Sequence, residues 1–342
     1  MKHLNRQINQ LFDDQIVHHL ALRIGRNEEI LHEVYRGDHG SVDEHTRFDM
    51  ASVSKILATT SIALIALATE KIHLEDRVTN FFPGPVDKQE MTIRHLLTHT
   101  MGVGHMPLNF PGNTYENIPA YILDLPSQEK IGTKVLYSCP GFILLGRILE
   151  KVYGKRIDIL FQEMVARPLG MTETCFCPEH TENMVNSNRD ADFLGVVNDY
   201  NCRFLGCVAG NAGVFSNIAD MTRYIHMLQA GGVPLFSRET LALASQNYTA
   251  SMGDGRGLGF LYVDEHYAQT GDLFPVGSIG HCGHTGQSFF LHREIGLYVI
   301  LLTDATVSTV KKYGKENYEE VKRMRADLHH AIKLDLQEMG SI

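Results

Sequence analysis

Residues 48–69 read Phe-Asp-Met-Ala-Ser-Val-Ser-Lys-Ile-Leu-Ala-Thr-Thr-Ser-Ile-Ala-Leu-Ile-Ala-Leu-Ala-Thr, and the remaining elements can be arranged around them. From Ser52 onward this stretch carries apolar side chains on nearly every helix face, which is typical of a helix buried inside a domain. Its most apolar part, residues 56–68, is interrupted by two threonines and a serine, so we expect it to be too short and too polar to cross a bilayer. The sequence therefore predicts a central core helix that begins at Ser52.

A serine and a lysine stand three positions apart at the start of this helix, at Ser52 and Lys55. Positions i and i+3 share a helix face, so the amine can reach the hydroxyl. A serine hydroxyl is a weak nucleophile unless a neighbouring base takes its proton, and a partly desolvated lysine can do this. The free backbone N–H groups of a helix start lie nearby. These two residues are therefore the first candidates for catalysis.

The same Ser-x-x-Lys spacing occurs at Ser127–Lys130 and at Ser308–Lys311, so spacing alone favours accidental surface pairs. The first pair follows a proline and leads into a glycine, which predicts a loop. The second lies beyond the last expected strand, and we expect no apolar helix after it. Only Ser52 begins a long buried helix, where a lysine needs a partner or a lowered pKa.

The composition is that of a folded, acidic protein. The 342 residues are 44% hydrophobic and 21% charged, with a formal net charge of −9 and no Trp. These values argue against a disordered chain. Because there is no basic tract to bind phosphates, nucleic acid is excluded as a main partner.

The start of the chain and its cysteines point to the cytoplasm. Residues 1–12 lack the continuous apolar run of a signal peptide and show helical spacing instead. Six cysteines are few for this length, so we expect free thiols in a reducing compartment. We expect a cytoplasmic protein without a membrane span, and the sequence leaves the oligomeric state open.

Strand signals near both chain ends enclose a helical middle. The expected elements are an amphipathic helix at 4–12, a β-hairpin at 16–35, mostly helices between 76 and 232, strands at 258–263, 288–292 and 297–303, and a terminal helix at 318–332. The ends then build one sheet and the middle forms a helical insertion, an α/β (α+β) fold. We expect residues 1–75 and 240–342 to form a sheet domain and residues 76–239 a helical domain, with the active site at the seam.

Two later segments extend the Ser-x-x-Lys pattern into an ordered triple. They are Tyr137-Ser138-Cys139-Pro140-Gly141 and His284-Thr285-Gly286. Ser-x-x-Lys, then Tyr-Ser-x, then a basic residue with Thr-Gly resembles the serine β-lactamase and penicillin-binding-protein superfamily, most closely its class C β-lactamase-like and esterase branch. Further matching segments are residues 48–52, 92–102, 168–172 and 209–216. The resemblance implies a β-lactamase/transpeptidase-like fold, with an antiparallel sheet and an inserted helical domain.

The resemblance also implies roles for individual residues. Ser52 would be the acylated nucleophile, Lys55 its proton partner and Tyr137 the general acid/base. Backbone N–H groups of Ser52 and Gln287 would form the oxyanion hole. The implied substrate-binding positions are Cys139, Asn201, His284, Thr285 and Gly286.

Two of these positions depart from the usual family pattern. Cys139 stands where the family has Asn, whose amide contacts both the lysine and the substrate's amide carbonyl. A thiol is a poor hydrogen-bonding group, so we expect that polar link to be lost. His284 replaces a lysine and is mostly neutral at pH 7, so it is a weaker site for a substrate carboxylate. Both changes affect β-lactam or peptide recognition more than acyl transfer itself.

The predicted activity is that of a serine hydrolase that forms a Ser-linked acyl-enzyme with a small ester or amide. An esterase, a D-amino-acid peptidase and a muropeptide amidase all fit this prediction. One alternative is a non-catalytic ligand-binding or scaffold member of the family, which Cys139 favours. The other alternative is a weak β-lactamase, which Cys139 and the missing export signal oppose.

The histidines and cysteines also suggest two possible metal sites. These are His95, His99 and His105, and Cys175, Cys177 and His180. Both stretches are accounted for as family scaffold, so we predict no metal and no cofactor.

Overall fold

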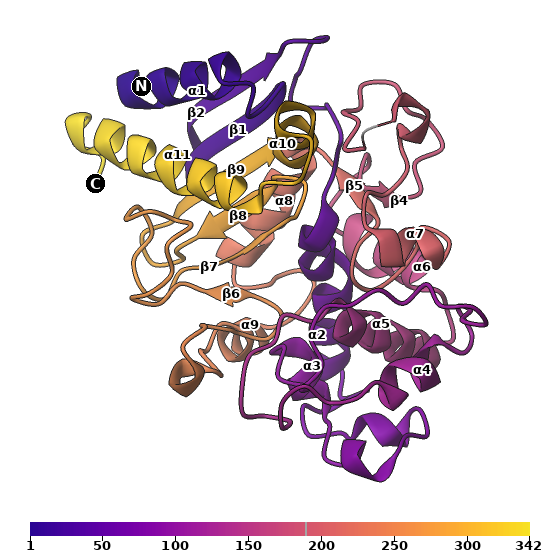
Figure 1. The fold of residues 1–342 in the computed structure, drawn as a ribbon. Coiled ribbons are helices and arrows are strands. Elements are labelled where there is room, and N and C mark those ends of the chain that lie inside the picture. Colours follow the sequence, from indigo (N-terminus) through magenta and orange to yellow (C-terminus); the bar gives the residue numbers. More distant parts are fainter. Residues whose placement is uncertain (189) are drawn as a thin grey trace.

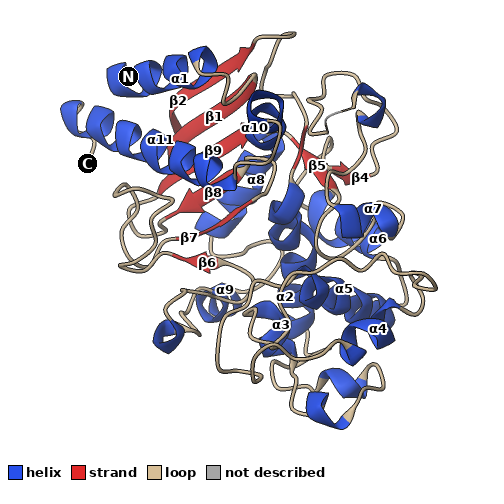
Figure 2. Cartoon of the chain, viewed as in Figure 1, coloured by secondary structure: helices blue, strands red, loops and turns tan. Residues whose placement is uncertain are grey.

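A six-stranded antiparallel sheet forms one half of the protein, and helices dominate the other half (Figures 1 and 2). The computed structural model describes residues 1–188 and 190–342. The strands are β1 (His19–Arg26), β2 (Glu29–Gly37), β6 (Leu261–Tyr262), β7 (Ile279–Cys282), β8 (Ser288–Leu291) and β9 (Leu297–Thr303). The order β2-β1-β9-β8-β7-β6 joins strands from both chain ends, because β1 pairs with β9. This confirms the predicted fold class.

Side chains on the two faces of the sheet enter two separate cores. The helices that cover these faces are α1 (Lys2–Asp13), α8 (Ile218–Gln229) and α11 (Tyr318–Glu338). Leu20 and Leu22 of β1 pack into the core that α1 and α11 complete. Ala21 of β1 and Ile300 of β9 enter the larger core, and α8 packs against these two strands. The period-2 alternation of the strands therefore produces a helix–sheet–helix sandwich.

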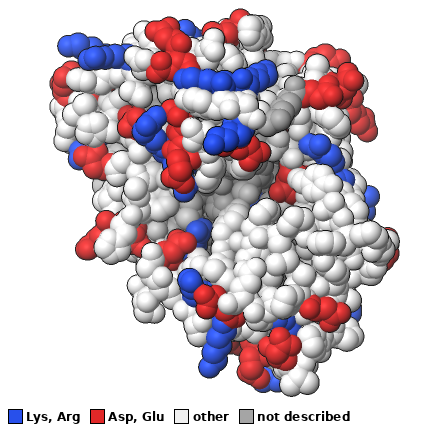
Figure 3. Space-filling view, viewed as in Figure 1, with Lys and Arg blue, Asp and Glu red and all other residues white. Residues whose placement is uncertain are grey.

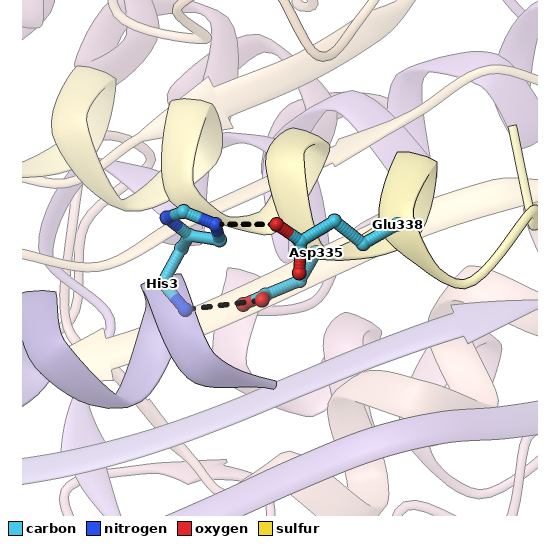
Figure 4. Close-up of side chains that lie close together, drawn as sticks. All are labelled: His3, Asp335 and Glu338. Carbon is cyan, nitrogen blue, oxygen red and sulfur yellow. Dashed lines mark hydrogen bonds and ion pairs between the residues drawn. The ribbon is translucent and has the colours of Figure 1, made fainter.

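The two ends of the chain are joined by a polar contact between α1 and α11 (Figure 4). The buried carboxylate of Asp335 accepts the backbone N–H groups of His3 at 3.0 Å and Leu4 at 2.8 Å. Nε2 of His3 lies 2.9 Å from Oε1 of Glu338. No side chain within α1 caps its N-terminus. Because both Asp335 oxygens accept helix N–H groups, this cluster serves as a cap supplied by the other end of the chain.

The central helix is present, but its hydrogen-bonding pattern changes along its length. It starts as a 3₁₀ turn at Ala51–Val53, continues as a π-helix at Lys55–Thr60 and becomes α2 at Ser61–Ala68. By length and hydropathy the longer run Ala51–Ala68 could span a membrane, and the expectation for residues 56–68 stays a prediction. However, 83% of this run is buried inside the protein, as expected for a core helix.

The remaining elements lie mostly around this central helix. They are α3 (Ile93–Leu97), α4 (Ile118–Asp124), α5 (Cys139–Tyr153), α6 (Ile157–Phe161), α7 (Tyr200–Phe204), α9 (Arg238–Ala244), α10 (Ala305–Tyr313) and a small sheet of β3 (Phe48–Asp49), β5 (Val214–Ser216) and β4 (Cys175–Phe176). The domain boundaries at 75/76 and 239/240 stay a prediction. Helix α8 lies within the expected helical part but packs against the large sheet.

Two expectations for the C-terminal third are wrong. Ser308 lies within helix α10, where no helix was expected, because burial outweighs the weak helix propensity of its Thr and Val neighbours. Ser308 points inward and Lys311 is exposed, so the two do not form a catalytic pair. The strand expected over 258–263 is reduced to β6, since Gly259 adopts a left-handed conformation with φ of 83°.

The cap on α1 generates a stability prediction. Asp335→Asn keeps the shape of the side chain but places an amide N–H₂ group against a backbone donor. We expect it to lower the free energy of unfolding by about 1–2 kcal/mol in urea titrations. Asp327→Asn, at an exposed position of the same helix, is the matched control. Equal stability of the two variants would contradict the capping role.

The pH dependence of this contribution has a definite sign. Burial opposes ionisation of Asp335, but the N–H groups of Leu4 and His3 prevail and lower its pKa. A lowered folded-state pKa stabilises the protein above the unfolded value of about 3.9, and this stabilisation is lost as pH falls through the lowered pKa. The stability difference between wild type and Asp335→Asn should therefore shrink only in strong acid.

Candidate active site

A cavity of about 710 Å³ lies between the sheet part and the helical part. Figure 3 shows the corresponding hollow in the middle of this face, with charges of both signs near its rim. Its wall contains Ser52, Tyr137 and Cys139 from the helical side and His281 and His284 from the sheet side. The cavity thus brings residues far apart in the sequence to one place.

The turn that carries Ser52 is strained and held by a buried carboxylate. Ala51 has φ of 44°, a left-handed conformation that is uncommon for a residue with a Cβ. Asp49 accepts the N–H of Ala51 at 2.8 Å and the N–H of Asn198 at 2.6 Å. Burial raises the pKa of Asp49 to about 6. This carboxylate fixes the turn, and the turn directs Ser52 into the cavity.

The amine of Lys55 is fully buried and has three acceptors. Its Nζ donates to Oγ of Ser52 at 3.0 Å, to the carbonyl of Asn211 at 2.9 Å and to Sγ of Cys139 at 3.4 Å. An ammonium group has three N–H donors, so this set satisfies its charged form. Burial opposes the charge, but electrostatic interactions with the ionisable Cys139 and Tyr137 side chains prevail and raise the Lys55 pKa above its usual value. Lys55 is therefore held as a cation beside the nucleophile.

Tyr137 lies over this lysine, immediately before α5. Lys55 Nζ lies 5.1 Å from the centre of the Tyr137 ring, and the ring of His99 packs 4.6 Å away. Burial raises the pKa of Tyr137 to about 12, against the opposing effect of the Lys55 charge. His99 accepts the N–H of Ser138 at 3.0 Å, and burial keeps its pKa well below the usual range. A neutral His99 thus supports the Tyr137 ring.

The expectation that Cys139 loses its polar link to Lys55 is wrong. Its sulfur remains within contact distance of the amine, as given above. Burial opposes ionisation of the thiol, but the charge of Lys55 and a hydrogen bond from His105 lower the Cys139 pKa. A thiolate is an adequate acceptor for an ammonium group, so the link changes its chemistry without being lost. What the side chain cannot supply is the N–H₂ donor of an amide.

The His-Thr-Gly segment divides between the cavity wall and the scaffold. His284 lines the cavity, where it stacks on Tyr318 at 5.7 Å and lies 3.4 Å from the Glu316 carboxylate. The hydroxyl of Thr285 instead donates to the Asp49 carbonyl at 3.0 Å and is itself buried. Gly286 has φ of 120°, and a Cβ there would lie 2.1 Å from the Thr303 hydroxyl. Thr285 and Gly286 therefore hold the turn between β7 and β8 in place, and their contact with substrate stays a prediction.

The two turns that carry the predicted oxyanion-hole residues pack against each other. The turn between β7 and β8 packs against the nucleophile turn, since a Cβ on Gly283 would lie 2.9 Å from the Met50 carbonyl. Gly283 donates its N–H to the Gln287 carbonyl at 2.7 Å, which closes this turn. The participation of the Ser52 and Gln287 N–H groups in an oxyanion hole stays a prediction.

Asn201 lines the cavity, but its amide is used within the protein. It accepts the N–H of Leu108 at 2.8 Å and donates to the Met106 carbonyl at 2.9 Å. These hydrogen bonds hold the loop at Met106 and Leu108, so Asn201 positions part of the cavity wall.

Sequence reasoning missed Asn211, Arg256 and His281. Asn211 lies in a segment that the resemblance covered, but its backbone carbonyl carries no signal in the sequence. Neither Arg256 nor His281 lies in a motif that the sequence analysis identified.

The two histidine and cysteine sets that the sequence analysis set aside as metal sites do not form a ligand cluster among the described residues. Among the described residues, only His3, Asp335 and Glu338 bring three metal-type ligand atoms together, and their hydrogen bonds already explain that cluster. The absence of a metal or cofactor stays a prediction.

Comparison with known proteins places this geometry in a family. The Beta-lactamase family model matches residues 4–321. The chain belongs to the beta-lactamase family. This confirms the resemblance seen in the sequence, and with it the assignment to β-lactamase-related serine hydrolases.

Several relatives of this family member are described as enzymes. The chain is 30% identical over 311 residues to a putative D-alanyl-D-alanine carboxypeptidase of Escherichia coli K12, covering 78% of this chain and 70% of the relative. It is 28% identical over 336 residues to the esterase EstB of Burkholderia gladioli, covering 82% and 84%. The structure of EstCE1, a hydrolase with promiscuous acyltransferase activity, shares the fold with a TM-score of 0.79 at 20% identity, covering 97% and 98% of the chains.

The geometry predicts that a serine-directed fluorophosphonate labels Ser52 alone. Ser52 is the serine that contacts a buried lysine at the cavity wall, whereas Ser127 contacts Lys88 outside the cavity and Ser308 is buried within α10. Peptide mapping by mass spectrometry should find the adduct on Ser52, and Ser52→Ala should abolish it. A label on either of the other two serines would overturn the assignment.

Proposed function

We propose that the protein hydrolyses a small ester or amide through an acyl-enzyme on Ser52. The observation that carries this proposal is the buried Lys55 ammonium, which donates to the Ser52 hydroxyl beside Tyr137 at the wall of an open cavity. A hydroxyl polarised in this way beside a proton acceptor is the arrangement that nucleophilic catalysis requires. The relatives described as esterase, carboxypeptidase and amidase support the same reaction class.

The proton transfers follow from the charge states. Because Lys55 uses all three N–H groups as donors, it has no lone pair with which to act as a base. The base must then be Tyr137 in its phenolate form: burial raises the pKa of Tyr137 to about 12, and the positive charge of Lys55 lowers the cost of forming the phenolate that takes the Ser52 proton. The Ser52 oxygen then attacks the substrate carbonyl, and Tyr137 returns the proton to the leaving group.

The second half of the reaction reverses these roles. Tyr137 takes a proton from water, the hydroxide attacks the acyl-enzyme, and the acid is released as Ser52 recovers its proton. During both attacks the carbonyl oxygen becomes negative, and the N–H groups of Ser52 and Gln287 would stabilise it. Each such donor is typically worth about 3 kcal/mol.

Cys139 favours esters over amides. An amide substrate has a carbonyl group that a side-chain amide can hold, and its leaving nitrogen must be protonated. An activated ester needs neither of these. The sulfur at this position can accept from Lys55 but cannot offer an N–H donor. We therefore place short-chain esters ahead of β-lactams as substrates.

We also propose a cytoplasmic location. All six cysteines are free in the structure. This includes the neighbours Cys177 and Cys207, where the sulfur of Cys177 lies 3.5 Å from the backbone carbonyl oxygen of Cys207. Unpaired neighbouring thiols are typical of proteins in a reducing compartment.

The substrate preference can be tested with a 4-nitrophenyl ester and a cephalosporin. We expect wild type to hydrolyse the ester and to turn over the cephalosporin very slowly. Cys139→Asn should raise kcat/KM for the cephalosporin by roughly 5- to 150-fold more than for the ester, because one good hydrogen bond contributes about 1–3 kcal/mol. Cys139→Ser is the matched control, since it provides a hydroxyl of similar size without an amide.

The outcomes separate the possible functions. Efficient cephalosporin hydrolysis by wild type would identify a β-lactamase and contradict the ester preference. Failure of wild type to hydrolyse either substrate, together with the absence of a Ser52 adduct, would identify a non-catalytic binding protein.

A further inference from the structure

Two cysteines from distant parts of the sequence meet beside the small sheet. Cys177 follows β4, and Cys207 follows α7. Sγ of Cys177 lies 3.5 Å from the carbonyl oxygen of Cys207, and its S–H group is also within hydrogen-bonding reach of the Cys207 sulfur. The segments pack closely, since a Cβ on Gly213 would lie 2.7 Å from the Cys207 carbonyl oxygen and 2.9 Å from Cδ1 of Phe176. The fold therefore holds these two thiols together.

Both cysteines have a backbone conformation that is uncommon for residues with a Cβ. Cys177 has φ of 44° and Cys207 has φ of 66°, both in the left-handed region. Such conformations cost free energy, persist where the surroundings determine them, and cluster at functional positions. Cys177 is exposed and Cys207 is half-buried, so solvent reaches the pair. Neither of these two described residues lines the cavity, so the pair is separate from the candidate active site.

The surroundings make the two thiols chemically different. The hydrogen bond from Cys177 lowers the pKa of Cys207 to about 6, against the opposing effect of burial. The positive charge of Arg203 and the N–H group of Val197 act in the same direction. This guanidinium is held in place because it donates to the Val197 carbonyl at 2.8 Å and 3.0 Å. The same thiol–thiol hydrogen bond raises the pKa of Cys177. Cys207 is therefore the nucleophilic thiolate at neutral pH, and Cys177 is the neighbouring thiol.

Burial separates the remaining four cysteines from this pair. Cys139 and Cys282 are buried and line the cavity. Cys202 is fully buried, and burial keeps its pKa well above the usual range. Cys175 is half-buried, and burial raises its pKa. The pair beside the small sheet thus combines a reactive thiolate with a partner thiol that solvent reaches.

We propose that Cys177 and Cys207 form a covalent modification site, a thiol pair that a peroxide oxidises to a disulfide. Redox-sensitive cysteines are accessible thiolates placed next to a second cysteine that completes the disulfide, as the geometry provides here. This proposal does not depend on the hydrolase function.

The oxidation takes place in two balanced steps. The Cys207 thiolate attacks one oxygen of hydrogen peroxide, the O–O bond breaks, and a sulfenic acid and hydroxide are formed. The Cys177 sulfur then attacks the sulfenic sulfur, the S–S bond forms, and the sulfenic hydroxyl group leaves as water with the Cys177 proton. The two sulfurs together lose two electrons and the peroxide gains them, so no other oxidant is required.

Mass spectrometry of the whole protein tests the pair directly. Reduced wild type is treated with hydrogen peroxide, the remaining thiols are blocked with iodoacetamide, and the digest is searched for cross-linked peptides. We expect a cross-link between Cys177 and Cys207 that corresponds to the loss of two hydrogen atoms, and we expect dithiothreitol to reverse it. Cys175→Ser is the matched control, because it removes a cysteine of β4 outside the pair, and it should form the same cross-link.

Single variants assign the two roles. In Cys177→Ser the sulfenic acid on Cys207 has no neighbouring thiol with which to condense, so dimedone should label Cys207 after peroxide treatment. In Cys207→Ser the remaining thiol is mostly protonated at neutral pH, so dimedone labelling of Cys177 should be roughly 10-fold lower. Labelling of Cys177 that equals or exceeds that of Cys207 would overturn the assigned roles.

Three results of the wild-type experiment would overturn the proposal itself. The first is that both thiols stay available to iodoacetamide after peroxide treatment. The second is that either of them is cross-linked to another cysteine in place of its partner. The third is that Cys207 is oxidised to sulfinic acid without a cross-link to Cys177.

Discussion

The buried ammonium group of Lys55 is the constraint around which the cavity is organised. Removing a charge from water costs several kcal/mol unless partners replace the lost hydration. Here the partners are Ser52 Oγ, Cys139 Sγ and the Asn211 carbonyl, which come from the nucleophile turn, the start of α5 and the loop before β5. Three separate segments must therefore adopt their registers together before the lysine can be buried. The catalytic geometry and the packing of the core are consequences of the same requirement.

Asp49 connects this centre to both walls of the cavity. Its carboxylate holds the Ala51 turn and the Asn198 loop, and its carbonyl accepts the Thr285 hydroxyl from the sheet side. The left-handed conformation of Ala51 is tolerated because these contacts determine it from several directions. The sheet thus contributes to catalysis by supporting the turn that presents Ser52. Thr285 acts through this support, while His281 and Arg256 face the cavity itself.

The sequence predicts the parts of this structure that depend on local pattern. The hairpin of β1 and β2 and the terminal helix follow hydrophobic periodicity, and the central helix follows from apolar residues on nearly all of its faces. The ordered motifs bring Ser52, Lys55 and Tyr137 together as expected. The directions in which side chains point could not be predicted from the local sequence pattern. The Thr285 hydroxyl turns toward Asp49, because the turn after β7 packs there. Arg256 and His281 reach the cavity wall only through long-range packing that no local motif records.

The charge of Lys55 is the central claim, and NMR titration of lysine side chains measures it directly. The Lys55 signal in ¹³C-lysine-labelled protein can be assigned by its absence in Lys55→Met. Exposed lysines lose their proton near pH 10.4, about the unperturbed value. We predict that the Lys55 signal remains that of an ammonium group through this range, since its surroundings raise its pKa. A Lys55 that loses its proton near pH 7–8, about where a general-base lysine titrates, would contradict a cationic Lys55 and return the role of base to its amine.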